Sequence, residues 1–296
     1  MIFAFFDALR PRSWTKNLLL FAGVLFSQQV GNPELLLRAA AGFVAFSLLA
    51  GLVYLLNDFR DKDADRLHPR KRKRPIASGR LTTGFALIAA IPVLAIVALV
   101  SVWLGRGFVI TLALYLVMNL AYTLALKKQV LIDVFIIATG FVLRAIAGVE
   151  LLKPVSPSTE LSPWLLVCTF FGALFLALAK RRREIANAGD VAASQREVLI
   201  HYTPQFLDGM LLITAGSSLM GYALYTIWPG TVAKFGTEAL LYTVPIVAYG
   251  IFRYLWLVSS SENTEDPSLV LLTDRPLAWC VVLYLAAVVL ILYGLR

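Results

Sequence analysis

The sequence predicts an all-α integral membrane protein with about nine transmembrane helices in one bundle. Hydrophobic residues occupy 59% of its 296 positions and charged residues only 15%, and the mean hydropathy is +0.77, values foreign to a soluble domain. Apolar stretches of roughly 20 residues, the length that crosses a hydrocarbon core as a helix, recur along the chain. We predict spans at residues 14–30, 35–57, 82–104, 107–126, 130–151, 163–180, 208–228, 238–258 and 277–295.

The first predicted span is the weakest, because its apolar core LLLFAGVLF is short. We expect it to continue a helix that begins in the amphipathic stretch FFDALRPRSW. Asp7, Arg10 and Arg12 interrupt the apolar start, so no cleavable signal peptide is predicted. The other spans are separated by polar segments, of which the longest are 57–81, 181–207 and 259–276.

The composition favours a single integral membrane domain, residues 1–296. The sequence contains no Gly/Ser-rich or Pro-rich linker, no evident internal repeat and no nucleotide-binding glycine loop. Its two cysteines, Cys168 and Cys280, lie inside apolar runs without metal-ligand spacing, so we interpret both as small hydrophobic residues. The sequence predicts no particular oligomeric state.

Lysine and arginine are distributed unevenly between the predicted loops. With nine spans and a cytoplasmic N-terminus, most of the 27 basic residues fall on the cytoplasmic side, as the positive-inside rule requires. Topology and anionic lipid then account for the net charge of +9 without nucleic acid as a partner. We therefore predict a multi-pass protein of the inner or plasma membrane whose active site faces the cytoplasm.

An acidic stretch, NDFRDKDADR, follows the second predicted span. Asn57, Asp61 and Asp65 are spaced i, i+4, i+8 and share one helix face, and Asp58 is displaced from them by one position. Such oxygen ligands at a membrane boundary suit Mg²⁺, which prefers a few carboxylates together with substrate phosphate oxygens. The alternative is a solvated helix end whose acids neutralise nearby bases. Acids at a helix C-terminus oppose its dipole, which favours the metal site.

A basic run, RLHPRKRKRPIASGRLT, comes directly after the acids. Positive-inside anchoring alone would explain any one of its residues. Next to a predicted Mg²⁺ site, however, a cluster of lysine and arginine provides the charge neutralisation that a pyrophosphate needs. Lys71 and Arg74 are therefore predicted to bind phosphoryl groups.

These two stretches resemble the signature of the UbiA superfamily of membrane transferases. The matching residues are NDFRDKDAD at 57–65 and HPRKRKRPIASG at 68–79, which includes His68. The resemblance implies a bundle of nine helices with an active-site cavity on the cytoplasmic side, capped by polar loops. It also implies Mg²⁺ as the cofactor, since most members bind a prenyl diphosphate through Mg²⁺ and pass the prenyl group to an aromatic ring or another acceptor.

Most members of that superfamily have a second aspartate-rich motif, which is missing here. The corresponding loop after the sixth predicted span reads LALAKRRREI, residues 176–185. A site for a second metal is thus replaced by one suited to anions, with Lys180, Arg181 and Glu184 as candidate substrate-binding residues. The alternative for this loop is a cytoplasmic membrane anchor.

Two further segments resemble one branch of the superfamily, the decaprenyl-phosphate phosphoribosyltransferases. They are RPRSWTKNLLLFAGVLFS at 10–27 and YTLALKKQVLIDVFIIATGFVLRAIAG at 122–148. This resemblance implies transfer of a phosphoribosyl group from phosphoribosyl pyrophosphate to a polyprenyl phosphate, with release of pyrophosphate, a reaction of cell-wall biosynthesis. Beyond about residue 185 no motif is diagnostic.

Arg144 lies well inside a predicted span, where an unpaired cation is unfavourable and a charged residue is a functional candidate. Asp133, three helical turns earlier, is ~16 Å away along the helix, too far for a direct pair. We expect Arg144 to bind a lipid phosphate or, alternatively, an acid of a neighbouring helix. Gly140 and Gly148, four residues to either side, would let another helix approach that face.

The predicted mechanism is attack of the lipid phosphate oxygen on the anomeric carbon of ribose, with pyrophosphate leaving. A phosphate monoester is already anionic, so the site needs to position two anions and stabilise the leaving group rather than supply a base. Asn57, Asp58, Asp61 and Asp65 are the predicted catalytic residues, and the remaining candidates for substrate contact are Lys16, Tyr54, Tyr122 and Lys127. Two alternatives remain: a UbiA-type prenyltransferase, and a lipid-binding or transport protein without enzymatic activity.

Overall fold

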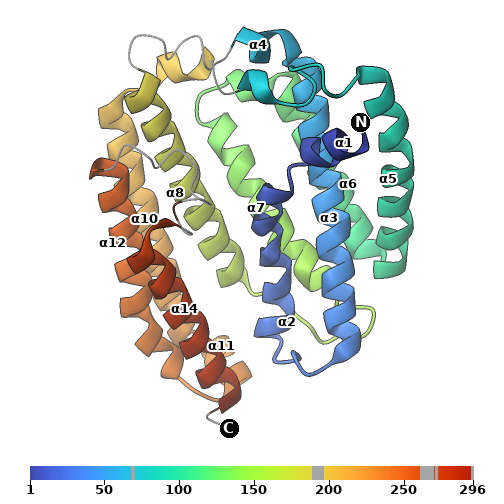
Figure 1. Ribbon diagram of the computed structural model, residues 1–296. Helices are drawn as coiled ribbons and strands as arrows, with labels where there is room; N and C mark the ends of the chain where they lie inside the picture. The colour runs from blue at the N-terminus through green and yellow to red at the C-terminus, as the bar shows by residue number, and fades with distance from the viewer. Residues whose placement is uncertain (68–70, 189–196, 261–269, 271–272, 295–296) are drawn as a thin grey trace. The chain divides into compact units, whose positions relative to one another are not determined.

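We describe the chain from a computed structural model. It describes residues 1–67, 71–188, 197–260, 270 and 273–294, and across these residues the secondary structure is helical, with no β-strand (Figure 1). Residues 68–70 of the basic run, among them His68, lie outside the described residues. The all-α prediction is confirmed.

Eight helices of the described chain are long and apolar enough to cross a membrane. They correspond to the second through ninth predicted spans, with ends that differ by a few residues. In chain order they are α3 (Pro33–Arg60), α5 (Thr83–Leu104), α6 (Arg106–Leu124), α7 (Ile132–Glu150), α8 (Pro163–Ala188), α10 (Pro204–Ile227), η6 with α12 (Ala239–Thr243 and Val244–Ser260), and α14 with the π-helical turn η7 (Arg275–Val289 and Leu290–Gly294).

The first predicted span has a different structure. The short helix α1 (Ile2–Ala8) ends before Arg10, which adopts a left-handed conformation with φ 53°, so the predicted continuous helix is broken there. The 3₁₀ helix η1 (Pro11–Phe21) and the α-helix α2 (Ala22–Phe26) follow. A 3₁₀ helix rises ~2.0 Å per residue instead of ~1.5 Å, so these two elements together extend to about 30 Å. That total is the thickness of a hydrocarbon core, but the apolar part, residues 18–26, covers only about half of it.

Several of the long helices begin with a capping side chain followed by proline. The Asn32 side chain accepts hydrogen bonds from the backbone N–H groups of Glu34 and Leu35 at the start of α3. Thr203 and Asp274 do the same for α10 and α14. Capping satisfies N–H groups that the first turn of a helix leaves unpaired, and proline is favoured there because it lacks such a group.

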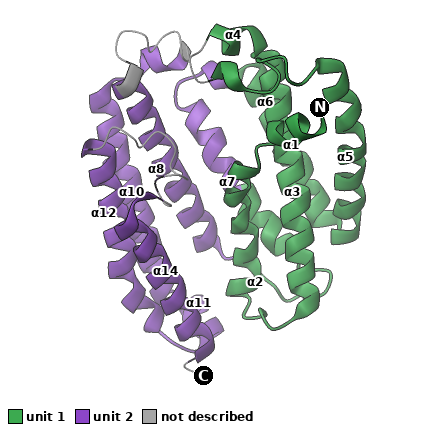
Figure 2. Ribbon diagram, viewed as in Figure 1, with its two compact units in different colours: residues 1–126, 143–160 green, residues 127–142, 161–296 purple. Residues whose placement is uncertain are grey.

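The described chain divides into two compact units, coloured separately in Figure 2. Unit 1 comprises residues 1–126 and 143–160, and unit 2 comprises residues 127–142 and 161–296, so α7 contributes to both. Each unit has its own apolar core. In unit 1, Leu20, Phe46 and Phe108 are fully buried, and in unit 2, Leu178 and Leu207 are.

Short elements complete the polar loops. After α3 the chain forms α4 (Lys62–Leu67) and the 3₁₀ turn η2 (Lys71–Lys73), both in unit 1. The 3₁₀ turn η3 (Leu126–Lys128), whose first residue belongs to unit 1, leads into α7. In unit 2, η5 (Glu197–His201) precedes α10, and α11 (Pro229–Phe235) follows it. Most candidate polar residues of the sequence lie on these elements and on the adjoining helix ends, whereas Lys16 lies on η1 and Arg144 lies in the interior of α7.

Candidate active site

The predicted acidic motif continues α3 by one further turn into α4. The Asp61 N–H donates to the Asn57 carbonyl at 2.9 Å, and the Asp65 N–H donates to the Asp61 carbonyl at 2.8 Å. These two bonds place Asn57, Asp61 and Asp65 one above another along one helix face, as their spacing predicted. Asp63 is not on this face, and its side chain is 93% exposed.

Two acids of the motif are buried and paired with arginine. Arg74 Nη1 donates to Asp65 Oδ2 at 2.6 Å and to Asp58 Oδ1 at 3.1 Å. Arg10 Nη2 donates to the same oxygen of Asp58. The Asp58 and Asp65 side chains are 2% and 4% exposed. Buried carboxylates require such partners, since an uncompensated charge inside a protein is strongly unfavourable.

One oxygen of this cluster has no hydrogen-bond partner among the described residues. Asp58 Oδ2 is buried and accepts no hydrogen bond within the described structure. A buried carboxylate oxygen without a donor is suited to a cation or to a donor group of a ligand. Across the described residues no three His, Cys, Asp or Glu side chains gather as a metal cage would require. A cation held here would need water or substrate oxygens to complete its shell, as Mg²⁺ commonly does.

Asn57 is oriented from the neighbouring helix α6. The Thr123 hydroxyl lies 2.6 Å from Asn57 Oδ1 and can donate to it, which leaves a second lone pair on that oxygen. Arg60 Nη2 donates to the Leu124 carbonyl at 3.1 Å, so the ends of α3 and α6 are tied together at two points. The predicted residue Tyr122 is half-buried in this last turn of α6.

The basic run is partly used to hold its own loop. Arg80 Nη2 donates to the Lys73 carbonyl at 2.9 Å and to Asp7 Oδ2 at 3.1 Å. Arg66 Nε donates to the Ala77 carbonyl at 3.3 Å. The two predicted phosphate ligands are both partly accessible: Lys71 on η2 is half-buried, and the Arg74 side chain is 28% exposed.

Arg144 is buried within unit 1, where its hydrogen-bond partners include two neutral groups. Its Nε donates to Asn17 Oδ1 at 2.6 Å, and its Nη2 donates to the Tyr115 hydroxyl at 3.0 Å. The guanidinium carbon also lies 5.1 Å from the centre of the Phe46 ring, a favourable cation–π distance. The sequence predicted a lipid phosphate or an acid as the partner of Arg144, and these neutral contacts were missed.

The N-terminal segment lies along one face of α3 in a defined register. Arg10 pairs with Asp58, and Asn17 Nδ2 donates to Ser47 Oγ at 2.8 Å. Along α3 these contacts are about 16 Å apart, and the seven residues from Arg10 to Asn17 span ~14 Å as a 3₁₀ helix but only ~10 Å as an α-helix. The 3₁₀ winding of η1 therefore lets both contacts form. Lys16, half-buried, lies beside Asn17 on the same element.

Unit 2 contains a second buried polar cluster, centred on Asp133 of α7. Arg181 Nε donates to Asp133 Oδ2 at 2.8 Å, and the Tyr202 hydroxyl donates to Asp133 Oδ1 at 2.7 Å. Arg181 Nη1 also donates to Glu184 Oε2 at 2.6 Å. Burial raises the pKa of Tyr202, and the hydrogen bond to the Asp133 carboxylate raises it further.

The arginines of the KRRRE segment bind groups of the protein itself. Arg181 is only 1% exposed and lies between two carboxylates. Arg182 Nε donates to Asp208 Oδ1 at 2.7 Å, and Arg183 Nη1 donates to the Val258 carbonyl at 3.0 Å. The prediction that Arg181 contacts a phosphoryl group stays a prediction. Lys180, which precedes this buried residue, is half-buried.

The predicted site residues thus fall into both units. Unit 2 contains Lys127 of η3 with Lys180, Arg181 and Glu184 of α8, and unit 1 contains Lys16, Tyr54, Asn57, Asp58, Asp61, Asp65, Lys71, Arg74, Tyr122 and Arg144. Within unit 1, contacts join Asp58, Asp65 and Arg74, whereas Arg144 belongs to a separate cluster with Asn17.

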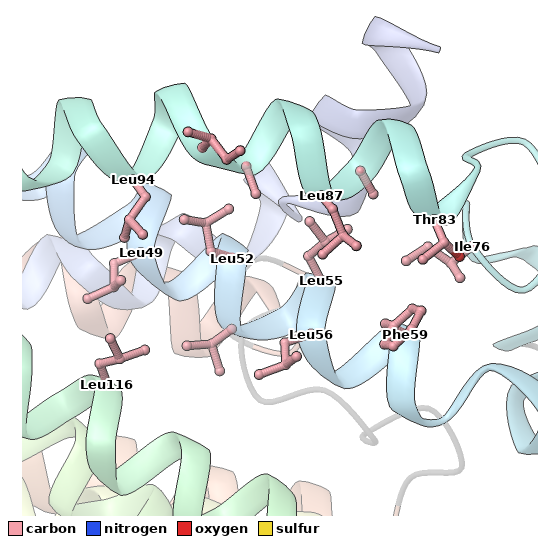
Figure 3. A pocket seen from close by; sticks show the side chains of 14 residues that line it. Leu49, Leu52, Leu55, Leu56, Phe59, Ile76, Thr83, Leu87, Leu94 and Leu116 are labelled. Atoms are coloured by element: carbon pink, nitrogen blue, oxygen red, sulfur yellow. The ribbon is translucent and has the colours of Figure 1, made fainter.

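A groove in unit 1 of about 290 Å³ is lined by α3, α5 and α6 (Figure 3). Leu52, Leu56 and Phe59 line it from α3, and Thr83 is its one residue with a polar side chain. At roughly 100° per residue, these positions lie on a different face of α3 from Tyr54 and Asp58. The groove fits hydrocarbon and is not part of the charged site.

The chain is similar to known proteins over most of its length. The model of the UbiA prenyltransferase family matches residues 18–274. The chain is 33% identical to a decaprenyl-phosphate phosphoribosyltransferase of Corynebacterium glutamicum over 299 residues, which cover 97% of this chain and 86% of the relative. It is 35% identical to a protein of the same name from Mycolicibacterium smegmatis over 281 residues, covering 91% and 86%.

Solved structures show the same fold. A UbiA homologue from Archaeoglobus fulgidus, bound to DMAPP and Mg²⁺, superposes with a TM-score of 0.72 at 18% identity, covering 98% of this chain and 99% of the other. At that identity the likeness establishes the fold alone. The chain is a multi-pass membrane protein with that helical fold.

Proposed function

The chain belongs to the UbiA prenyltransferase family, and on that premise we propose that it transfers a phosphoribosyl group from phosphoribosyl pyrophosphate to a polyprenyl phosphate. The observation that carries this proposal is its similarity, across nearly its whole length, to curated relatives named decaprenyl-phosphate phosphoribosyltransferase. The KRRRE segment supports it, because a basic segment stands where most of the family has a second acidic motif.

In the proposed reaction an oxygen of the lipid phosphate attacks the anomeric carbon of ribose. The new carbon–oxygen bond forms as the bond from that carbon to pyrophosphate breaks, and pyrophosphate leaves with the electron pair. The attacking phosphate is already anionic, so the protein need not remove a proton from it. Its residues instead hold two anions near each other and stabilise the leaving group.

Asn57, Asp61 and Asp65 are the residues we propose to hold Mg²⁺, with Asp58 beside them. The unpartnered buried oxygen of Asp58 and the one-face arrangement of the other three support this choice. When bound, Mg²⁺ would neutralise charge on the pyrophosphate oxygens. Lys71 and Arg74 are proposed to contact the same phosphoryl groups, because both lie beside the acids and are partly accessible.

The residues proposed for the lipid phosphate and for ribose lie further along the chain. We propose that the positive charge for the lipid phosphate comes from Lys16, Lys127 and Arg144. Substrate contacts near the acidic motif are proposed for Tyr54 of α3 and Tyr122 of α6. In the KRRRE segment we propose Lys180 as the direct phosphate ligand. Arg181, held by Asp133 and Glu184, and Glu184 itself are the other residues of this segment that we propose for substrate contact.

We propose that the active site faces the cytoplasm of the cell membrane. The support is the excess of lysine and arginine in the segments that adjoin the acidic motif and the KRRRE segment. Phosphoribosyl pyrophosphate is a soluble, highly charged molecule, so a site on this side would take its donor from water and its acceptor from the bilayer.

The donor is tested by ligand-dependent thermal stability. A ligand that binds the native protein raises its unfolding temperature, so with Mg²⁺ present phosphoribosyl pyrophosphate should stabilise more than a prenyl diphosphate at equal concentration. Ribose 5-phosphate, which lacks the diphosphate, serves as the matched control and should stabilise least. Stabilisation by the prenyl diphosphate alone would instead favour the prenyltransferase alternative.

A further inference from the structure

Arg10 is bound to the acidic motif across 48 residues of sequence. It and Arg74 share Asp58 Oδ1, and Arg74 also binds Asp65. Two guanidinium groups thus balance two buried carboxylates, while Asp58 Oδ2 accepts no hydrogen bond within the described structure. The charges of the ligand-free cluster are balanced by arginine at the very place where the proposed function puts a divalent cation.

The structure holds Arg10 at this place through three residues of one α3 face. A Cβ added to Gly51 would lie 3.0 Å from Leu9, so the glycine permits the chain before Arg10 to approach closely. One turn later the Tyr54 ring lies under the Arg10 guanidinium, 4.7 Å from it, a cation–π contact. Asp58 follows one turn further along. Gly51, Tyr54 and Asp58 together form a seat for Arg10.

The two kinds of partner differ in freedom to move. The Asp58 and Asp65 side chains are 2% and 4% exposed, whereas those of Arg10 and Arg74 are 29% and 28% exposed. The carboxylates are enclosed by packing, and the guanidinium groups, on longer side chains, reach the solvent. The arginine side chains therefore have more freedom to reorient than the carboxylates.

We propose that Arg10 and Arg74 substitute for the metal in the ligand-free site and become diphosphate ligands when metal and diphosphate arrive together. The carboxylates then bind the divalent cation, and the arginines turn to diphosphate oxygens. Arg10 is thereby a substrate-binding residue of the site. The inference rests on the proposed function only in taking a diphosphate as ligand, a group that phosphoribosyl pyrophosphate and prenyl diphosphates share.

Charge balance makes this binding cooperative. A metal ion alone must compete with two guanidinium groups for the carboxylates. A diphosphate alone must compete with the carboxylates for the arginines. With both ligands bound, the carboxylates pair with the cation and the arginines pair with the diphosphate, so each group that loses its partner gains a new one, which neither ligand alone provides. Each ligand therefore raises the affinity for the other, and by the same factor, because coupling between two ligands is reciprocal.

The test measures metal binding directly, without turnover. Mn²⁺, another divalent cation that prefers oxygen ligands, is titrated into the full-length protein in detergent and followed by electron paramagnetic resonance, with and without saturating inorganic pyrophosphate. The variants are Arg10→Gln and, as the matched control, Arg12→Gln, which removes an exposed cation two residues away. Thermal unfolding of each preparation verifies that it is folded.

In the wild-type protein, pyrophosphate should tighten Mn²⁺ binding about tenfold, within the usual range of coupling between ligands. In Arg10→Gln the affinity for Mn²⁺ without pyrophosphate should rise, because a competing cation is gone. The enhancement of that affinity by pyrophosphate should fall to about threefold. Arg12→Gln should match the wild type in both. Weaker Mn²⁺ binding by Arg10→Gln, or an unchanged enhancement, overturns the proposal.

Arg10→Lys keeps the inference testable if Arg10→Gln does not fold. Lysine retains the positive charge but not the planar fork that binds two oxygens at once. Its Mn²⁺ affinity without pyrophosphate should stay near that of the wild type, and its enhancement by pyrophosphate should fall. Tighter binding of Mn²⁺ alone by this charge-conserving variant contradicts competition between cations. Neither probe contains ribose or an isoprenoid, so failure of the proposed donor would leave this result intact.

Discussion

Arg144 Nε donates a hydrogen bond to Asn17 Oδ1 at 2.6 Å, and this bond joins α7 to the 3₁₀ helix η1 inside unit 1. Asn17 in turn donates to Ser47 of α3 at 2.8 Å. A single asparagine thus connects a buried cation to two helices. The contact fixes where the guanidinium points before any lipid phosphate binds.

Arg144→Leu tests whether that guanidinium serves the acceptor. Removing it leaves Asn17 Oδ1 and the Tyr115 hydroxyl without this partner, which should lower stability by about 1–3 kcal/mol. Binding of phosphoribosyl pyrophosphate should persist while acceptor-dependent transfer is largely lost. Arg106→Leu, which removes an exposed cation of α6, is the control and should keep both. Normal transfer by Arg144→Leu would make Arg144 a structural residue.

Asp61→Asn should abolish transfer and leave the protein folded. The substitution keeps the size of the side chain but removes a negative charge from the face that we propose for Mg²⁺. Asp63→Asn is the matched control, because Asp63 is 93% exposed and its pair with Arg66 is a surface pair of little energetic weight. It should retain activity. Transfer by Asp61→Asn at the wild-type rate would remove Asp61 from the metal site.

Tyr202→Phe should destabilise the protein by about 1–3 kcal/mol, because it leaves Asp133 Oδ1 and the Leu131 N–H without their partner. It should also change the response to alkali. The pKa of Tyr202 is raised in the folded state, so the unfolded chain loses this proton first, near its ordinary pKa of 10.0. The contribution of Tyr202 is therefore complete below pH 10 and declines above it.

Thermal unfolding at pH 8 and pH 11 checks whether the stabilisation by Tyr202 declines as the pH rises. The difference in stability between wild type and Tyr202→Phe should be smaller at pH 11, because only the wild type has this alkaline loss. Tyr242→Phe is the control, since Tyr242 is 79% exposed, and it should differ little from wild type at either pH. A Tyr202→Phe effect that grows with pH would contradict the assigned hydrogen bond.

Gly23→Ala should separate η1 and α2 from α7. A Cβ at Gly23 would lie 2.1 Å from the Gly148 carbonyl oxygen, a backbone atom that has little room to move. We expect a loss of about 2–3 kcal/mol in stability, measured by thermal unfolding. At Gly84 of α5 an added Cβ meets nothing within 4 Å, so Gly84→Ala should be neutral or slightly stabilising. Equal stability of the two variants would contradict the close approach.

Much of the fold could be predicted from hydrophobicity, because a helix that crosses a membrane must be a long apolar run. Pro33–Arg60 and Thr83–Leu104 begin and end within a few residues of the predicted limits. The 3₁₀ winding of Pro11–Phe21 could not be predicted in this way. This winding accompanies two tertiary contacts, at Arg10 and at Asn17, which the composition of the segment does not reveal.

The candidate site was predictable where its residues are neighbours in sequence. Asn57, Asp61 and Asp65 share a face because of helical periodicity, which spacing alone reveals. Arg10 was missed as a site residue because its partner is 48 positions away. The one available signal was its place in the RPRSWTKN segment, which the resemblance had already marked. Apart from Glu184, the acceptors of Arg181, Arg182 and Arg183 in unit 2 are likewise distant in sequence, so charge alone suggested a substrate site.

The central claim is most directly tested by one transfer measurement. The purified protein is incubated with Mg²⁺, a polyprenyl phosphate and phosphoribosyl pyrophosphate labelled in its ribose, and the label recovered in the lipid phase is counted. We predict labelled lipid that depends on both the divalent cation and the lipid phosphate, with pyrophosphate released in equal amount. Absence of labelled lipid, from protein that transfers the prenyl group of a prenyl diphosphate under the same conditions, would contradict it.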